Sequence, residues 1–582
     1  MKQALIINVT RMGDLIQTGP LLSRLREERP DVAIDLVVDR SFAPTAALLT
    51  GIRQVFSCDF ARLLDDCRTQ SKNLVTLMQE MTVWAAPLRD ARYDRIVNLT
   101  FNRQTGLLAS YIGAPDLRGI TAGPDGSPIV QNSWLSYFTD LHRHRRFNRF
   151  NLVDLYAMGG SGPGAFSPLS VAVPADGRAW ADGFLRSQDR SVRQWIAVQV
   201  GASDVMKAWR PEYFGRTLAG LSRHPGAGFV LIGTAAEAGA IELAKRSYRA
   251  NGGAAPILDA SGRTTLNQLV GLLSRCHLLL TNDTGPMHLA VGVGTAVIDL
   301  SVGHVDHHET GPYGPGHWVI QPDLACSPCG FDQICAHHAC KDRLVPEEVA
   351  DLCLHAMGLA PFPSWSAGVR VYQSSADADG LGSFILRAGQ LDAGTAWYAA
   401  FWRRFWYEDF AGKPSQLAPN LEPAPDQARA MAWMKEAVQP LRRLEQHARD
   451  IVALTRRHPL PVSILQREQV LLRREREQLL PRMMAHSATG PATVAMIRDI
   501  HNDDAVSLTM LADRHVKAYR RWQERIARTR QLLSAAPPQF KKRQRPLPMM
   551  RSAVETGGTG EEMLSAELEA RREGRDGSIW CV

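Results

Sequence analysis

Short apolar runs alternate with amphipathic stretches along the first part of the chain, and this alternation most constrains its fold. Residues 4–9 (ALIINV) precede a stretch with three leucines at residues 21–25, and residues 33–40 and 93–100 repeat the apolar run. Buried strands that are separated by helices form parallel sheets covered on both faces. The pattern therefore predicts an α/β domain whose ligands bind beyond the carboxyl ends of the strands.

A second alternating set follows, with apolar runs at residues 196–200 and 228–232 that each end in a glycine turn. Two successive α/β halves predict two domains with a ligand cleft between them. The chain has 582 residues, more than one hydrophobic core accommodates. We expect an N-terminal half at residues 1–185, a second half at 186–360, a mainly helical extension at 361–535, and a disordered tail at 536–582.

Composition and charge exclude several classes of protein. Hydrophobic residues make up 45% of the chain and charged residues 22%, which is typical of a globular protein. The net charge of +8 is spread along the chain without a compact nucleic-acid module, so we expect no nucleic-acid partner. Arg11 and Asp14 break any N-terminal signal sequence, and no apolar run is long enough to span a bilayer. We expect a cytoplasmic bacterial protein that could contact the inner-membrane surface.

A polar turn stands at the mouth of a helix in the second half. The apolar run at residues 277–281 leads into Asn282, Asp283, Thr284 and Gly285, and a helix is expected to open at the next residue. Unpaired N–H groups and the helix dipole attract anions there, which indicates a phosphate-side pocket. The same residue types are ordinary helix caps and turn formers, so both interpretations stay open on local chemistry.

Other polar residues follow the predicted strands. Asp14 at a helix start stays ionised easily and would suit a general base, although it could equally cap the helix. Ser203 and Lys207 lie in a loop of small residues that permits close approach to a diphosphate. His288 is one helical turn past Thr284 and could face the same pocket, although a histidine on an apolar helix is more commonly a core residue.

The motifs of the first 357 residues resemble those of glycosyltransferase family 9, the ADP-heptose:lipopolysaccharide heptosyltransferases. The matching segments, in order, are MGD with a downstream Pro20, GASDVMKAWRPEYF, LIGTAAE, NDTGPMHLA and TGPYGPGHW. The resemblance implies a GT-B fold of two Rossmann-like domains, with the acceptor on the N-terminal half and the nucleotide-sugar on the other. It implies an inverting transfer without a catalytic metal, from ADP-heptose as the family expectation, to a lipopolysaccharide-core or related lipid-linked acceptor.

The resemblance also assigns roles to individual residues. It makes Asp14 the general base and places Arg11 and Gly13 in the acceptor-side loop. The donor-side set comprises Lys207 as the second catalytic residue, Ser203 beside it, Glu237 at the ribose, and Asp283, Thr284, Gly285 and His288 along the pyrophosphate. Fixed positive groups beside the leaving phosphates would lower the activation barrier of sugar transfer. The residues leave two alternatives open, a protein acceptor and a non-catalytic nucleotide-binding scaffold.

Four cysteines, Cys326, Cys329, Cys335 and Cys340, fall within fifteen residues. Four thiolates can close a tetrahedral zinc site, and the leading C-x2-C is a usual metal knuckle. Reduced, partly buried thiols are the alternative. We expect no catalytic cofactor and leave structural zinc open.

The remaining segments carry weaker patterns. The basic, aromatic-interleaved residues 141–150 suit an anionic acceptor, a membrane surface or a solvated helix face. Residues 369–375 and 382–389 read as strands around ADADG, which resembles a metal dyad but is more often a turn. The aromatic residues 397–410 suggest docking onto the main body rather than an interfacial membrane helix. Helical periodicity from residue 426 to 533 predicts a bundle for oligomerisation or a protein contact, with Pro440 kinking or restarting its helix.

Overall fold

The computed structural model describes residues 1–186, 192–331, 333–418, 422–502 and 507–534. The predicted tail from residue 536 lies outside the described residues. The first sheet has the order β3-β2-β1-β4-β5-β6. Its strands are β1 (Gln3–Ile7), β2 (Ala33–Asp39), β3 (Gln54–Cys58), β4 (Arg95–Asn98), β5 (Asp116–Ala122) and β6 (Pro128–Gln131). All neighbours are parallel except β5 and β6, so the alternating pattern correctly predicted the parallel sheet.

The second sheet has the order β14-β13-β12-β11-β10-β7-β8-β9. Its parallel strands are β7 (Gln194–Gln199), β8 (Ala227–Ile232), β9 (Ile257–Asp259), β10 (Leu278–Asn282), β11 (Ala296–Leu300) and β12 (Trp318–Pro322). The hairpin of β13 (Val369–Ala376) and β14 (Gly382–Ala388) adds an antiparallel edge. Every residue of β8 and β10 is buried, as expected for strands covered by helices on both faces.

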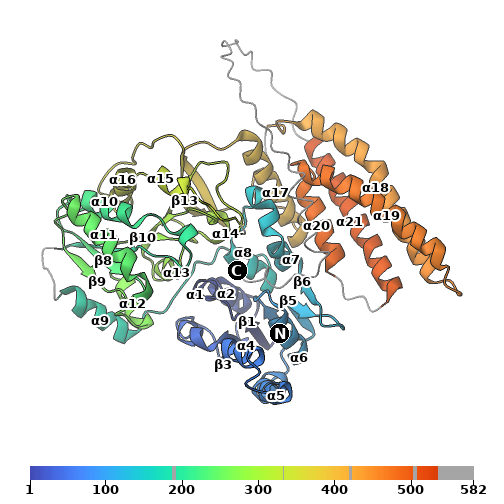
Figure 1. The fold of residues 1–582 in the computed structure, drawn as a ribbon, viewed down its shortest axis with the longest axis horizontal. Coiled ribbons are helices and arrows are strands. Elements are labelled where there is room, and N and C mark those ends of the chain that lie inside the picture. Colours follow the sequence, from blue (N-terminus) through green and yellow to red (C-terminus); the bar gives the residue numbers. More distant parts are fainter. Residues whose placement is uncertain (187–191, 332, 419–421, 503–506, 535–582) are drawn as a thin grey trace, which may run out of the picture.

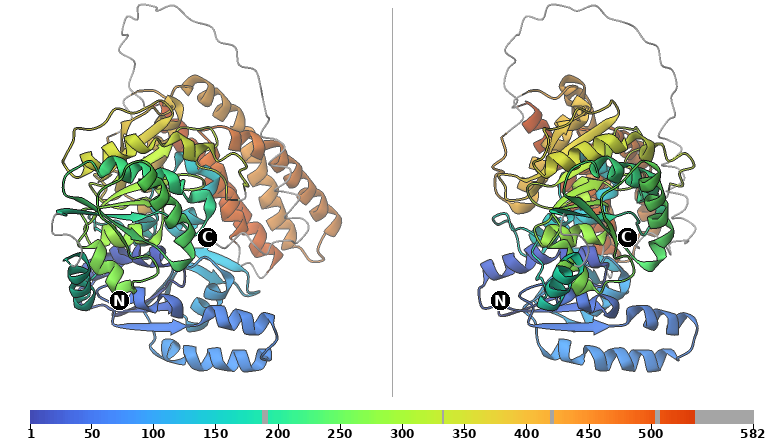
Figure 2. Two further views of the ribbon diagram at one scale, coloured as in Figure 1. Left: turned by 60° about the vertical axis from the view of Figure 1, so that its left-hand side comes forward. Right: turned by 90° about the vertical axis from the view of Figure 1, so that its left-hand side faces the viewer.

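Helices cover both sheets, and most of the blue first half lies below the green second half in both views of Figure 2. The first half contains α1 (Met12–Ile16), α2 (Gly19–Glu28), η1 (Arg40–Phe42), α3 (Ala43–Ala46), α4 (Phe60–Arg68), α5 (Leu74–Asp90), α6 (Arg103–Ile112), α7 (Ser133–Thr139), η2 (Leu141–Phe147) and α8 (Leu152–Gly160). The second contains α9 (Ala175–Arg186), η3 (Val205–Lys207), α10 (Pro211–Leu221), η4 (Ala235–Glu237), α11 (Ala238–Ala250), α12 (Leu266–Leu273), α13 (Gly285–Gly292), α14 (His307–Thr310), α15 (Ala339–Arg343) and α16 (Pro346–Ala356).

Two of the sequence-based domain limits fall within packed structure. The limit at residue 185 lies inside α9, and α9 packs against α12 of the second half so closely that a Cβ on Gly177 would lie 2.0 Å from the Asn267 carbonyl oxygen. The limit at residue 360 separates β12 from its hydrogen-bonded neighbour β13. The second sheet therefore uses residues from both sides of each limit, and the extent of independently folding units stays a prediction.

The extension begins with α17 (Ala393–Ala411), whose aromatic side chains are buried in the main body. Trp402, Phe405, Trp406 and Tyr407 are each at most 2% exposed. Tyr407 meets the ring of Trp134 in α7 at a centroid distance of 6.2 Å, so the extension and the first half share one hydrophobic core. This confirms the prediction that the aromatic cluster docks onto the body.

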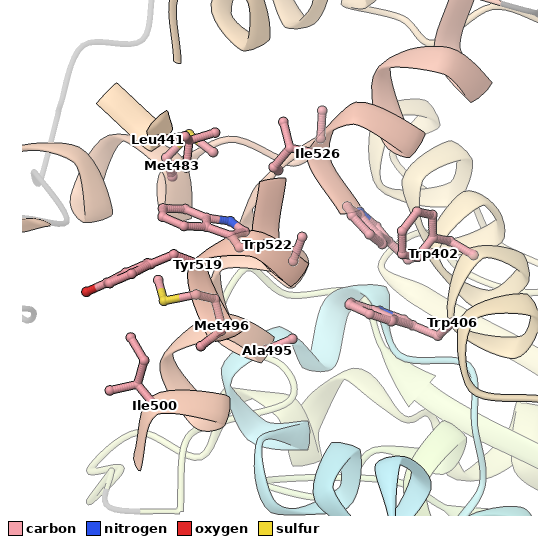
Figure 3. Packing of buried hydrophobic residues seen from close by; sticks show 14 of the residues in the cluster. Trp402, Trp406, Leu441, Met483, Ala495, Met496, Ile500, Tyr519, Trp522 and Ile526 are labelled. Atoms are coloured by element: carbon pink, nitrogen blue, oxygen red, sulfur yellow. The ribbon is translucent and has the colours of Figure 1, made fainter. Parts of the chain in front are cut away.

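The remaining helices form a bundle of α18 (Gln427–Thr455), α19 (Val462–Ala485), α20 (Gly490–His501) and α21 (Leu508–Ser534). Figure 3 shows Tyr519 and Trp522 of α21 among Leu441, Met483 and Met496 from the other three helices. The helix α18 runs through Pro440 and does not restart there, so of the two predicted outcomes only the kink stays a prediction. Proline removes one main-chain hydrogen bond, and the packing of the apolar stripe compensates.

The Asn502 side chain connects the bundle to the first sheet. Asn502, which follows α20, accepts a hydrogen bond from the Val130 N–H at 2.6 Å and donates to its carbonyl at 2.7 Å. The amide thereby satisfies the exposed edge of β6. Within the described part of the chain, none of the helices is long and apolar enough to span a bilayer.

Candidate active site

Asp14 lies in the short helix α1, directly after the carboxyl end of β1. The Asn8 side chain donates to the Asp14 carbonyl at 3.2 Å and to the Thr18 hydroxyl at 3.0 Å, which fixes the turn between strand and helix. The Asp14 carboxylate accepts the Arg11 N–H at 3.3 Å. Burial raises the pKa of this carboxyl above its ordinary value, against the opposing effects of that hydrogen bond and the Arg11 charge. A raised pKa suits a base that must accept a proton near neutral pH.

Asn282 holds the donor-side loops together at the end of β10. Its side chain donates to the carbonyls of Val200 and Gly201 at 3.0 and 3.2 Å and accepts the Trp209 N–H at 2.9 Å. The loop after β7 is therefore attached at both ends to the strand that leads into α13. This places the Lys207 segment beside the N-terminus of α13, as expected for loops at the carboxyl edge of a parallel sheet.

Two glycines allow α1 and α13 to touch. A Cβ on Gly13 would lie 2.8 Å from His288 Cδ2, and one on Gly285 would lie 2.3 Å from Met12 Cε. A side chain at Gly13 would displace the buried His288 ring, so this position requires glycine for close approach, whereas at Gly285 only the end of the flexible Met12 side chain would have to move. The contact brings Asp14 of the first half next to the donor-side turn of the second, and the Asp283 charge contributes to the raised pKa of Asp14 after burial.

Asp283 and Lys207 carry the charges of the donor side. Asp283 Oδ2 accepts the Thr310 hydroxyl at 2.6 Å. Lys207 is partly exposed and, among the residues that the structure describes, has no carboxylate within ion-pair distance. Its ammonium is therefore available to an anionic ligand. A cation with no protein partner beside a helix N-terminus is suited to hold a diphosphate.

His288 is only 4% exposed, and its Nδ1 has no hydrogen-bond partner in the described structure. Burial, with the Lys207 charge as a smaller cause, lowers the pKa of the imidazole to about 4, against the opposing Asp283 carboxylate. The ring is consequently neutral at pH 7. It can donate a hydrogen bond to a phosphate but cannot supply positive charge.

Glu237 lies over the end of β7. Its carboxylate accepts the Thr234 N–H at 2.6 Å and the Gln199 side-chain amide at 2.9 Å, and a Cβ on Gly201 would lie 2.0 Å from its Oε1. A carboxylate has lone pairs beyond these two bonds and could accept ribose hydroxyls. Ser203 is exposed on the loop that follows Gly201, and Arg11 is exposed on the other side of the junction.

Sequence reasoning missed a second carboxyl beneath this site. Asp299 on β11 is fully buried, and neither of its oxygens has a hydrogen-bond partner in the described structure. Burial, and then the Asp283 charge, raise the pKa of Asp299 well above its ordinary value. Asp299 lies near the turn at residues 282–285 because β11 pairs with β10, which sets Asp299 beside Thr281. The local sequence AVIDL gives no sign of this pairing.

The basic segment around η2 needs a correction at Arg145. This residue is neither solvated nor free for an acceptor, because its guanidinium donates to both Glu309 oxygens at 2.7 Å. It also donates to the carbonyls of Cys329 at 2.9 Å and His304 at 2.7 Å. Arg145 thus connects the first half to the loop that ends in Thr310. No local pattern could predict a pair 164 residues apart.

The four cysteines gather beside this loop. Cys329 and Cys340 are buried, Cys335 is partly exposed and Cys326 is exposed. Burial raises the pKa of the Cys329 thiol, and the other three thiols add to the shift, so the four lie near one another. Among the described residues, three or more metal-ligating side chains do not converge at any point. The structural zinc stays a prediction.

Residues 170–338, which hold every donor-side element described above, match the model of glycosyltransferase family 9 (heptosyltransferase). This part of the chain is similar to glycosyltransferase family 9. This confirms the family and the enzyme class that the motifs predicted. The two α/β sheets that meet at α1 and α13, followed by a helical bundle, agree with the predicted fold class.

Several known proteins are similar to this glycosyltransferase. Lipopolysaccharide heptosyltransferase 3 of Escherichia coli (strain K12) is 24% identical over 303 residues, which are 51% of this chain and 80% of that protein. Lipopolysaccharide heptosyltransferase 1 of Pseudomonas aeruginosa is 23% identical over 380 residues, 62% of this chain and 99% of that protein. The solved E. coli ADP-heptose lps heptosyltransferase II has a TM-score of 0.44 at 17% identity, covering 61% of this chain and 98% of that one.

Proposed function

We propose that this enzyme transfers a sugar from a nucleotide-sugar with inversion, using Asp14 as the general base. The contact between α1 and α13 carries the proposal, because it sets the carboxylate of one half against the donor-side turn of the other. A base at this position can take the proton of an acceptor hydroxyl while that oxygen attacks the sugar carbon. Arg11 and Gly13 shape the acceptor side of the same loop.

The donor side offers positive groups where the leaving diphosphate gathers charge. Lys207 contributes an ammonium that has no carboxylate partner among the described residues, and the Gly285 N–H contributes at the positive end of α13. Neutral His288 adds a hydrogen-bond donor, Asp283 and Thr284 orient the turn, and Ser203 and Glu237 bind the phosphate and ribose regions. These groups supply the electrostatic stabilisation without a catalytic metal, so we propose metal-independent chemistry.

Heptose is the proposed sugar and ADP-heptose the proposed donor. The description of the family model and the names of the relatives at 23–24% identity support heptose transfer. The same names support a lipopolysaccharide-core or related lipid-linked acceptor. An acceptor of this kind would place the enzyme in the bacterial cytoplasm at the inner-membrane surface.

The proposal is tested by incubating the full chain with candidate nucleotide-sugars and lipopolysaccharide-core acceptors. We expect release of a nucleoside diphosphate that depends on acceptor, with the new glycosidic bond inverted relative to the donor as seen by NMR. Release with a protein acceptor alone would change the acceptor class. Nucleotide binding without release for any acceptor would show a non-catalytic scaffold and overturn the proposal.

A further inference from the structure

The turn between α18 and α19 exposes apolar and cationic side chains together. This hairpin forms the right-hand edge of the molecule in Figure 1, away from the α1–α13 junction. Leu460, Val462 and Ile464 are 42%, 53% and 50% exposed, and Val470 further along α19 is 62% exposed. Water-exposed apolar side chains that cluster at one projecting point commonly mark an interaction site.

Arginines surround these apolar residues and have no acidic partners. Residues 450–474 contain five arginines, two acidic residues and no lysine, a net charge of five minus two, or +3. The arginines are Arg456, Arg457, Arg467, Arg473 and Arg474, and all five are exposed. Three nearby acids are already engaged, because Glu468 pairs with His447, Glu475 with Arg443 and Glu445 with Arg449. Among the described residues, no carboxylate lies within ion-pair distance of the five.

The helical geometry separates this surface from the bundle core. Leu465, Leu472 and Leu479 follow one stripe of α19 and are buried against the bundle. Arg467, Val470 and Arg474 lie on the opposite side of the same helix, since their spacing turns them about half a revolution away. Arg467, Val470 and Arg474 therefore belong to the outer face of α19, and Leu460, Val462 and Ile464 are exposed at the adjoining turn and the start of the helix.

We propose that this surface, defined as residues 456–474 on the outer side of the α18–α19 hairpin, docks onto an anionic phospholipid bilayer. Headgroup phosphates supply the missing partners of the arginines, while the acyl boundary accepts Leu460, Val462 and Ile464. Arginine stems can lie along the apolar region with their guanidinium groups in the headgroup layer. A nucleic acid would neutralise the arginines but would leave the apolar residues in water.

The helix α5 gives an internal contrast within the same molecule. Leu74, Val75 and Met78 are 65%, 64% and 61% exposed, so this surface is at least as apolar. Its basic neighbours are paired, however, as in the contact of Lys72 with Glu80 at 2.5 Å. Without unpaired cations, α5 lacks the charge complementarity that an anionic bilayer requires.

The test is flotation of the full chain with phosphatidylcholine vesicles, with and without phosphatidylglycerol. We expect binding only with phosphatidylglycerol, weakening as salt rises. The triple variant Arg456→Gln/Arg457→Gln/Arg467→Gln should bind about a hundredfold more weakly, because each arginine near an anionic surface contributes roughly a fivefold factor. The variant Leu460→Ser/Val462→Ser should also lose binding, which a purely electrostatic partner such as nucleic acid would not require.

Two controls keep the outcome decisive. The variant Arg223→Gln/Arg246→Gln/Arg249→Gln removes the same charge from exposed arginines of the second half, and Val75→Ser/Met78→Ser removes apolar side chains from α5. Both should bind vesicles like the wild type, and circular dichroism should show all variants folded. Equal binding to both lipid mixtures, equal loss in the charge control, or preferential binding of the hairpin to an oligonucleotide would overturn the proposal. None of these measurements depends on glycosyl transfer.

Discussion

The molecule contains two groups of buried or partly buried aspartates with very different numbers of hydrogen-bond partners. In the clasp formed by the β13–β14 turn and α17, Arg403 donates to Asp377 at 2.5 Å and to Asp379 at 3.2 Å. Asp379 also accepts the Ser415 hydroxyl and the Gln416 N–H at 2.6 and 2.7 Å. At the junction, Asp14 accepts one backbone hydrogen bond, and Asp299 has no partner in the described structure.

The clasp carboxylates stabilise the fold, whereas we propose that the junction carboxylates act on bound substrate. The clasp carboxylates are held by Arg403 and by several N–H and O–H donors, which indicates that the ADADG turn has a structural role. Asp299 is buried without a partner in the described structure, which costs stability, whereas Asp14 is partly compensated by the Arg11 N–H and the Arg11 charge. Such a cost is expected where a group must be available for substrate.

The largest expected effect comes from Asp14→Asn, which keeps the size of the side chain but removes the base. Transfer should fall about 10²–10⁴-fold, the usual contribution of a positioned base. ADP affinity should stay nearly unchanged, because we propose that Asp14 acts on the acceptor. Steady-state kinetics and calorimetry measure both quantities. The matched control is Asp90→Asn at the exposed end of α5, which should retain wild-type transfer.

Removing the cation of the clasp should produce the next largest effect, on stability rather than chemistry. Arg403→Met leaves two buried carboxylates unpaired and should lower the free energy of unfolding by about 3–5 kcal/mol. Denaturant unfolding measures the change. Arg404→Met is the neighbouring control, because its partly exposed pair with Glu408 is worth at most about 1 kcal/mol. Similar losses of unfolding free energy in both variants would show that the Arg403 ion pairs stabilise the fold no more than an exposed pair does.

Lys207→Met should weaken transfer by about 10²-fold, since it removes one of the fixed charges at the departing diphosphate. The loss should appear in both kcat and ADP affinity, in contrast to Asp14→Asn. Lys245→Met serves as control, because Lys245 pairs with Glu242 and Asp259 away from the junction. If Lys207→Met retained full ADP affinity, the ammonium would not bind the diphosphate.

The smallest expected effect concerns Asp299 and the pH dependence of stability. Because the pKa of Asp299 is raised in the fold, its stabilising contribution is complete below the ordinary carboxyl pKa and is lost as pH rises through the folded value. Asp299→Asn should therefore unfold with a flatter dependence on rising pH than the wild type. Unfolding free energies measured across the acidic to neutral range test this. An unchanged slope would show that Asp299 ionises freely in the fold.

The two α/β halves and the core motifs could be predicted because they depend on local order in the chain. Apolar periodicity gives β1 and β10, and the turn after each strand must lie at the carboxyl edge of its sheet. Asp14 and Asp283 could be named on this basis. The residues that surround them could not be predicted. The pairing of Arg145 with Glu309, and the position of Asp299 beside the turn, depend on contacts between segments that are distant in the sequence. The helix α18 does not restart at Pro440, because the apolar stripe on both sides of the proline packs into one core.

The most direct test of the account is the pH profile of kcat/KM for wild type and Asp14→Asn. Asp14 must be ionised to accept a proton, so activity should fall on the acid side, and burial should move this acid limb above the ordinary pKa range of an aspartate. The account predicts that the limb disappears from the residual activity of Asp14→Asn. An acid limb at the same pH in the variant would contradict the assignment of Asp14 as the base.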